Sequence, residues 1–137
     1  MSVPLNERTS GKLEVCVKAH FLCCYTLQIT ANDKIFDEKY KESLTDKIVN
    51  AAIDIHTLVW SANNVRVNSQ EDYYKRHMMQ EDAAIKCNIL LSLIEIAHKM
   101  FHLSSKRVQY WSCLAMETRK LIRAWHESDA KRYVEYR

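Results

Sequence analysis

The scarcity of glycine and proline restricts the fold of this chain more than any other feature of its sequence. Among the 137 residues there is one glycine, Gly11, and one proline, Pro4. Nothing from residue 12 onward therefore supplies the residues that usually mark tight turns. We predict an all-helical protein, and the length fits one domain that buries a core without disulfides or metal ions.

The first half of the sequence predicts two helices. The first covers about residues 11–31, and its segment VCVKAHFLCCYTLQI is apolar nearly all the way round, so it needs cover on more than one side. A polar break at residues 32–34 precedes the second helix, about residues 37–65, with Asp37 as its N-terminal cap. Helical spacing gives this second helix a core-facing stripe of Leu44, Ile48, Ala51, Ala52, Ile55, Leu58, Val59 and Ala62.

The second half predicts two more helices. Ser69 and Asp72 resemble a capping box that starts the third, which ends before Leu103, and Ser104 caps the fourth. The third helix has a predicted stripe of Ile85, Ile89, Leu90, Leu93, Ile94, Ala97, Met100 and Phe101. The fourth has a predicted stripe of Val108, Trp111, Leu114, Ala115, Thr118, Leu121, Ile122 and Trp125.

Short connections between long amphipathic helices are typical of an antiparallel, up-down-up-down four-helix bundle. We expect the bundle to occupy residues 11–135, preceded by a disordered arm of residues 1–10. The surplus of apolar surface on the first helix predicts that bundles associate into a ring-like homo-oligomer. The three tryptophans, Trp60, Trp111 and Trp125, lie on or beside the stripes, which favours packing over base stacking.

Basic residues are concentrated near the C-terminus. Residues 1–98 contain eleven Lys or Arg and thirteen Asp or Glu, whereas residues 99–137 contain nine and four. Such asymmetry is a known indication of a surface for polyanions, although a solvated helix face can carry several lysines for no further purpose. The candidate nucleic-acid-binding residues are Lys106, Arg107, Arg119, Lys120, Arg123, Lys131 and Arg132.

Potential metal ligands are too few for a metal centre. Glu95 and His98 have the Glu-x-x-His spacing of a di-iron bundle, but that centre needs a second copy, which the sequence lacks. His98 and His102 stand one turn apart, and two imidazoles leave a zinc site short of ligands. We therefore predict no metal and no cofactor.

The five cysteines predict neither a disulfide framework nor a nucleophile. Cys16, Cys23, Cys24, Cys87 and Cys113 are odd in number and contain no C-x-x-C pair, which is typical of reduced core residues. Partners in a Cys–His nucleophile pair need not be adjacent in sequence, but cysteines in apolar helices lack the exposed, electropositive setting that forms a thiolate. We predict no catalytic residue.

The N-terminal segment MSVPLNERTSGK lacks the apolar stretch of a signal peptide, and no apolar run approaches the roughly 20 residues of a membrane span. These features predict a soluble, cytoplasmic protein that does not contact the membrane.

Three stretches of the sequence carry a resemblance to a known family. They are FDEKYKESLTDKIVNAAIDIHTLVWSAN, the segment QEDAAIKCNILLSLIEIAHKMFHLSSKRVQYWSCLAMETRKLIRAW, and within it the Leu-Ser-x-Lys joint of residues 103–106. Over roughly residues 12–128 the chain resembles the accessory variability determinant (Avd) of diversity-generating retroelements. It also resembles the related four-helix proteins encoded in ribosomal-RNA intervening sequences.

The resemblance implies a homopentameric barrel of four-helix protomers with a basic surface that binds RNA or DNA. It also implies a reverse transcriptase as partner, in mutagenic retrohoming. We therefore expect a non-enzymatic, nucleic-acid-binding accessory protein. The leading alternative is a scaffold or protein-interaction bundle without a nucleic-acid role, and a metal-dependent bundle enzyme is the third hypothesis.

Overall fold

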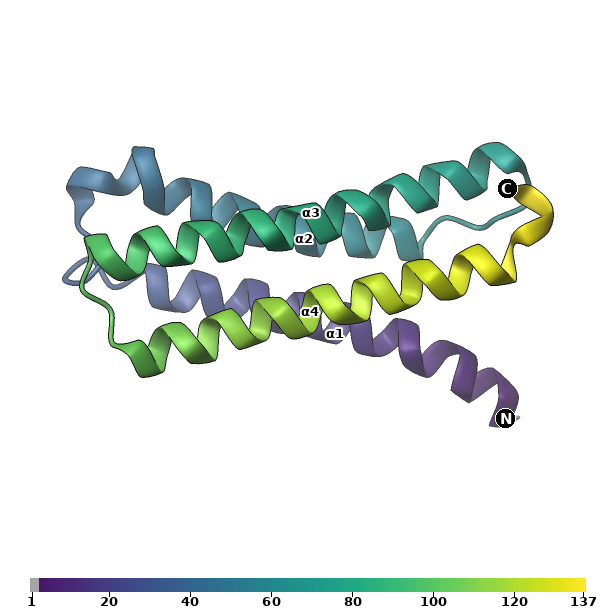
Figure 1. Cartoon of the computed structure of the whole chain (residues 1–137), viewed down its shortest axis with the longest axis horizontal. Helices are drawn as coiled ribbons and strands as arrows, with labels where there is room; N and C mark the ends of the chain where they lie inside the picture. The colour runs from purple at the N-terminus through teal and green to yellow at the C-terminus, as the bar shows by residue number, and fades with distance from the viewer. Residues whose placement is uncertain (1–2) are drawn as a thin grey trace.

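The computed structural model describes the backbone of residues 3–137 and the side chains of residues 14–137. Its elements are α1 (Val3–Thr30), η1 (Glu38–Tyr40), η2 (Lys41–Thr45), α2 (Asp46–Asn63), α3 (Gln70–Met100), α4 (Ser105–Arg132) and η3 (Val134–Tyr136). Both α1 and α3 pack against α2 and α4 (Figure 1). The described residues contain no strand. This confirms the predicted all-α four-helix bundle.

The four long helices run alternately up and down the bundle (Figure 1). The α1–α2 and α3–α4 connections lie at one end, whereas the α2–α3 connection and the C-terminus lie at the other. The candidate basic helix, α4, therefore has one side against the bundle and its other side open.

Local capping sets where α3 and α4 begin. The Ser69 hydroxyl accepts a hydrogen bond from the Asp72 amide at 3.1 Å, and the Asp72 carboxylate accepts one from the Asn68 amide at 3.1 Å. The Ser104 hydroxyl accepts from the Arg107 amide at 3.2 Å. These bonds satisfy amides that have no partner within the helix, and both predicted caps are confirmed.

The segment before α2 is less regular than the sequence pattern predicts. Asp37 is a cap, since its carboxylate accepts from the Lys39 amide at 3.0 Å, but it starts a 3-10 turn. A short π-helix, Lys41–Thr45, follows before α2 begins at Asp46. The predicted single helix of residues 37–65 is therefore three helical pieces in succession, ending at Asn63.

The first helix begins earlier than its predicted start near Gly11, since α1 runs from Val3. A glycine inside a helix costs about 1 kcal/mol relative to alanine but does not end it, and a proline is tolerated in the first turn. The predicted disordered arm of residues 1–10 includes residues 1 and 2, which lie outside the described residues, and side chains that are not described. The arm stays a prediction.

The core-facing stripes predicted for α2 and α4 are largely confirmed. Only Leu58 of α2 and Val108 and Leu121 of α4 are half-buried, and every other member of those two stripes is buried. Trp111 and Trp125 belong to the core, whereas Trp60 is exposed on the outer side of α2. Packing therefore explains two of the three tryptophans.

The stripe predicted for α3 is wrong in part, because Ile85, Ile89 and Met100 are exposed by 49%, 42% and 41%. The seam that faces the bundle instead alternates steps of four and three residues: Arg76, Gln80, Ala83, Cys87, Leu90, Ile94, Ala97 and Phe101. The residues in the first half of this seam are polar or small. A prediction based on hydrophobicity alone therefore places the neighbouring isoleucines in the core instead. Contacts with α2 and α4 decide which side of α3 is buried.

Two sets of buried polar contacts join helices inside the core. The Trp111 indole N–H of α4 donates to the Thr26 hydroxyl of α1 at 3.0 Å, and both residues are fully buried. At the other end, Asp129 of α4 pairs with Arg76 of α3 at 2.6 Å and accepts from the Gln80 amide at 2.7 Å. Buried polar groups of this kind are stable only when they are paired.

The α3–α4 connection contains a residue with left-handed backbone geometry, His102, with a φ of 53°. Helices often end in this conformation, but glycine is the usual residue because a Cβ is strained there. We expect His102→Gly to raise the free energy of unfolding by roughly 0.5–1 kcal/mol, the relief of strain being partly offset by greater freedom of the unfolded chain. Urea denaturation measures the change. His102→Val should be destabilising, and equal stability of the two variants would contradict this explanation.

Candidate nucleic-acid interface

All seven candidate basic residues lie on α4 or at its end, in three groups along the helix axis. Lys106 and Arg107 are in the first turn, residues 119–123 contribute the middle group, and Lys131 and Arg132 are in the last turn. At about 1.5 Å per residue, the nearest members of the first and middle groups are about 18 Å apart along the axis, and those of the middle and last groups are about 12 Å apart. The residues are therefore spread along the helix and do not form a compact cluster.

Some of these basic groups are engaged within the protein. Arg119 is half-buried and donates to the Asn88 side chain of α3. Lys131 lies 3.9 Å from Glu127, and the Arg132 guanidinium lies 5.2 Å from the centre of the Tyr133 ring. These contacts leave the three side chains less available for an external phosphate.

The other four candidates are exposed: Lys106, Arg107, Lys120 and Arg123. Within residues 14–137, none of the four is within ion-pair distance of a carboxylate. A cation whose charge is not neutralised inside the protein is able to neutralise a phosphate and release its counterions. The structure thus divides the seven predicted residues into four free and three engaged groups.

The acidic residues of α4 offset only part of this positive charge. Asp129 is buried, and its charge is matched by Arg76 inside the core. Glu117 lies 3.5 Å from Lys18 of α1, and Glu127 is the partner of Lys131. With Asp129 matched inside the core, Glu117 and Glu127 are the exposed acidic residues of α4 that offset its basic side chains.

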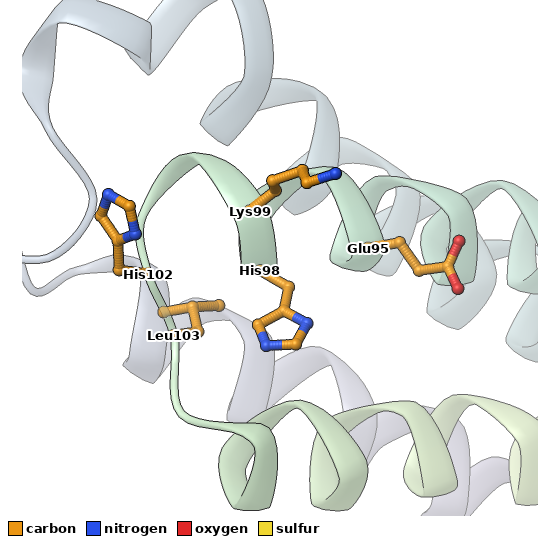
Figure 2. Close-up of a pocket in the computed structure, with 5 residues that line it drawn as sticks. All are labelled: Glu95, His98, Lys99, His102 and Leu103. Atoms are coloured by element: carbon orange, nitrogen blue, oxygen red, sulfur yellow. The ribbon is translucent and has the colours of Figure 1, made fainter.

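The Glu95, His98 and His102 side chains do not assemble into a metal centre. They line a surface hollow of about 630 Å³ together with Lys99 and Leu103 (Figure 2). In Figure 2 the Glu95 side chain points away from His98, and His102 lies on the far side of the connecting chain. Among the described side chains, these residues are not part of any three-ligand group.

The cysteines of the core are poorly suited to act as nucleophiles. Burial raises the pKa of Cys87 to about 12, and it also raises the pKa of Cys16 and of Cys23. Cys24 is half-buried and Cys113 is exposed, so not every cysteine is a core residue as we expected. A thiol becomes reactive only when it loses its proton, which burial opposes.

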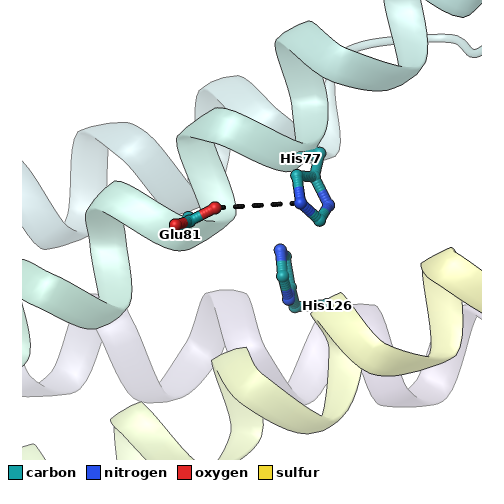
Figure 3. A group of neighbouring side chains, drawn as sticks. All are labelled: His77, Glu81 and His126. Carbon is teal, nitrogen blue, oxygen red and sulfur yellow. Dashed lines mark ion pairs between the residues drawn. The ribbon is translucent and has the colours of Figure 1, made fainter. Parts of the chain in front are cut away.

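One group of potential metal ligands is not predicted from the sequence: His77 and Glu81 of α3 and His126 of α4 (Figure 3). His77 and Glu81 are four residues apart, which places them on one face of a helix and is the only local signal. His126 is far away in the sequence, so no spacing rule connects it with the other two.

None of the helices, over the described residues, has the length and apolar character needed to cross a bilayer. Comparison of the chain with protein-family models, with curated proteins and with solved structures gives no match. The resemblance to the retroelement accessory proteins therefore depends on the sequence stretches quoted above.

Proposed function

We propose that this protein is a non-enzymatic nucleic-acid-binding accessory protein that acts as a homo-oligomer. The observation that carries the proposal is the set of four exposed basic side chains on α4 whose charge is not neutralised by a carboxylate within the described side chains. Contacts of this kind recognise the phosphate backbone, so binding is poorly sequence-specific and weakens steeply with salt.

Exposed apolar side chains support the oligomeric part of the proposal. On α1, Val17 and Phe21 are exposed on the same face. On α3, six exposed apolar residues follow an eleven-residue repeat, with Tyr74, Ile85 and Ile96 in one register and Met78, Ile89 and Met100 in the other. Eleven residues are slightly more than three turns, so all six lie in one stripe about 39 Å long.

A contiguous exposed apolar stripe is typical of a surface that contacts another protein. In a ring, α4 would be repeated on every subunit, and individually weak phosphate contacts would add through avidity. The pentameric state and the partnership with a reverse transcriptase in a diversity-generating retroelement rest on the sequence resemblance.

A fluorescence-anisotropy titration with labelled RNA and DNA, at two salt concentrations, tests the proposal. We expect Lys120→Glu with Arg123→Glu to abolish binding, because both side chains are exposed and form no ion pair with the side chains of residues 14–137. The control is Lys47→Glu with Lys75→Glu, two exposed lysines on α2 and α3. Both double variants change the net charge by the same amount. A difference in their binding of RNA or DNA therefore reports a specific role of α4.

The wild type and the control should bind RNA or DNA at low salt and release it as salt rises. Light scattering of the same samples should give a multimer for all three proteins. Absence of binding by the wild type, or equal loss in both double variants, would contradict a binding face on α4. A monomeric wild type would contradict the avidity argument.

The exposed stripe of α3 also favours a second candidate function, a scaffold that binds other proteins. An amphipathic helix face with regularly spaced apolar anchors is a common docking surface for a partner helix. This candidate becomes the preferred one if the wild type binds neither RNA nor DNA at low salt.

A further inference from the structure

The group formed by His77, Glu81 and His126 joins α3 to α4 through side chains that can ligate a metal (Figure 3). One potential ligand atom from each residue lies within 4.8 Å of the others. The His77 and His126 rings are stacked, with centroids 4.0 Å apart, and the His77 Nε2 atom is 3.7 Å from the Glu81 carboxylate. The three residues therefore face one small volume between the helices.

The hydrogen bonds around this group leave nitrogen atoms available. The Tyr73 hydroxyl lies 3.3 Å from Nδ1 of His77, which orients the ring so that Nε2 is toward Glu81. The Nε2 atom of His126 is buried and has no hydrogen-bond partner among the described residues. Burial of a polar atom without a hydrogen-bond partner is unfavourable for stability, and coordination of a metal ion is one way to give such an atom a partner.

The surroundings of His126 favour the neutral form of its imidazole ring. Burial lowers its pKa, and the nearby His77 lowers it further, against the smaller opposing effects of Glu81 and Asp129. A neutral imidazole has a free lone pair, which is the form that binds metal ions.

We propose that His77, Glu81 and His126 form a binding site for a zinc ion. Two imidazoles and one carboxylate are a ligand set that zinc accepts, with a fourth position left for water. This departs from the absence of metal predicted from the sequence, because it uses residues that only the packing of α3 against α4 brings together. The proposal is independent of the nucleic-acid function.

Closing the site requires a small movement of side chains. Tetrahedral ligands at about 2.0–2.1 Å from zinc are about 3.3 Å from one another, compared with separations of up to 4.8 Å here. The lone pairs of an imidazole lie in its ring plane, and the two ring planes are stacked at an angle of 29°, so one ring must turn for both to reach the same ion. Glu81 is exposed and free to rotate toward them.

A cavity beside the group gives access and room for a fourth ligand. It has a volume of about 440 Å³, and its lining includes Glu81, His126 and the guanidinium-bearing Arg123. The positive charge of Arg123 weakens the attraction for a cation but favours an anionic ligand in the open position, such as hydroxide. Nitrogen ligands also favour zinc over magnesium or calcium, which prefer oxygen.

Calorimetric titration of the chelator-treated full chain with zinc chloride, under reducing conditions, tests the site. We expect one saturable zinc per chain and a rise in the melting temperature. His77→Ala and His126→Ala should lose this binding. Glu81→Gln should weaken it by about tenfold or more, and Tyr73→Phe by about tenfold, since even outer partners of a ligand contribute on this scale.

Two control variants identify binding elsewhere on the protein. His20 lies 3.6 Å from the Cys24 thiol, and His98 faces the hollow at the other end of α3, so each is a conceivable alternative ligand. His20→Ala and His98→Ala should keep the wild-type affinity. Glu81 is exposed, so Glu81→Gln should fold even if a histidine variant does not. Absence of saturable binding, or binding unchanged by Glu81→Gln, would overturn the proposal.

Discussion

Replacing Asp129 with alanine is expected to lower the free energy of unfolding by about 3–5 kcal/mol, since the variant leaves a buried charge without its counter-charge. Arg76 and Asp129 are each 2% exposed, and the Arg76 guanidinium donates to both oxygens of that carboxylate, at 2.6 and 3.1 Å. Arg76 also donates to the Val65 carbonyl at 3.2 Å and lies 5.1 Å from the centre of the Trp125 ring. Urea unfolding followed by circular dichroism measures the loss.

Two comparisons separate this cause from a general effect of removing a carboxylate. Asp54→Ala removes the partner of Lys86 from an exposed ion pair, and should cost only about 0–1 kcal/mol. Joint replacement of Arg76, Gln80 and Asp129 by methionine, leucine and leucine should restore much of the stability, because apolar side chains need no counter-charge. Equal losses in Asp129→Ala and Asp54→Ala would contradict the explanation.

Replacing Trp111 with alanine is expected to cost a similar amount, about 3–5 kcal/mol, through the cavity left by a large core side chain. Trp111 is 0% exposed and packs edge-on against Tyr25 and Phe36, with ring centroids 6.5 and 6.4 Å apart. The variant also leaves the buried Thr26 hydroxyl without the indole N–H as its donor. Thermal unfolding and urea unfolding should agree on the size of the loss.

The chain contains its own control for this prediction, because Trp60 is 43% exposed. Trp60→Ala removes the same side chain from the surface and should change stability by far less, about 0.5 kcal/mol if the site contributes to no interface. Thr26→Val isolates the hydrogen bond and should cost about 1–3 kcal/mol, because it leaves the indole N–H buried and unpaired. Similar losses from Trp60→Ala and Trp111→Ala would show that core packing is not the cause.

The two core contacts and the basic surface lie on opposite sides of α4, so their variants should have different effects on stability and on nucleic-acid binding. Asp129 and Trp111 lie on the buried side of α4, whereas Lys120 and Arg123 lie on its exposed side. Charge reversal at the exposed positions should therefore change binding without changing stability. Loss of either core contact should lower stability first, and binding only as the folded fraction falls.

The amino-acid sequence by itself determined the number of helices and most of their ends. Ser69 and Ser104 form their capping bonds within three residues of sequence, so the signal for each helix start is local. The stripes of α2 and α4 are also readable, because their buried positions are mostly apolar and follow the helical period. The basic character of α4 follows from composition alone.

Tertiary structure decided which side of α3 is buried and which polar groups are paired. Arg76 and Asp129 are 53 residues apart, and neither reads as a core residue until the other is beside it. His77 and His126 likewise meet only because α3 and α4 pack antiparallel. The same packing engages Arg119 through Asn88, whereas Lys120 and Arg123 form no ion pair with the described side chains. The periodicity of the sequence shows which face of a helix is apolar. Whether a charged side chain is buried depends instead on a counter-charge or hydrogen-bond partner from another helix.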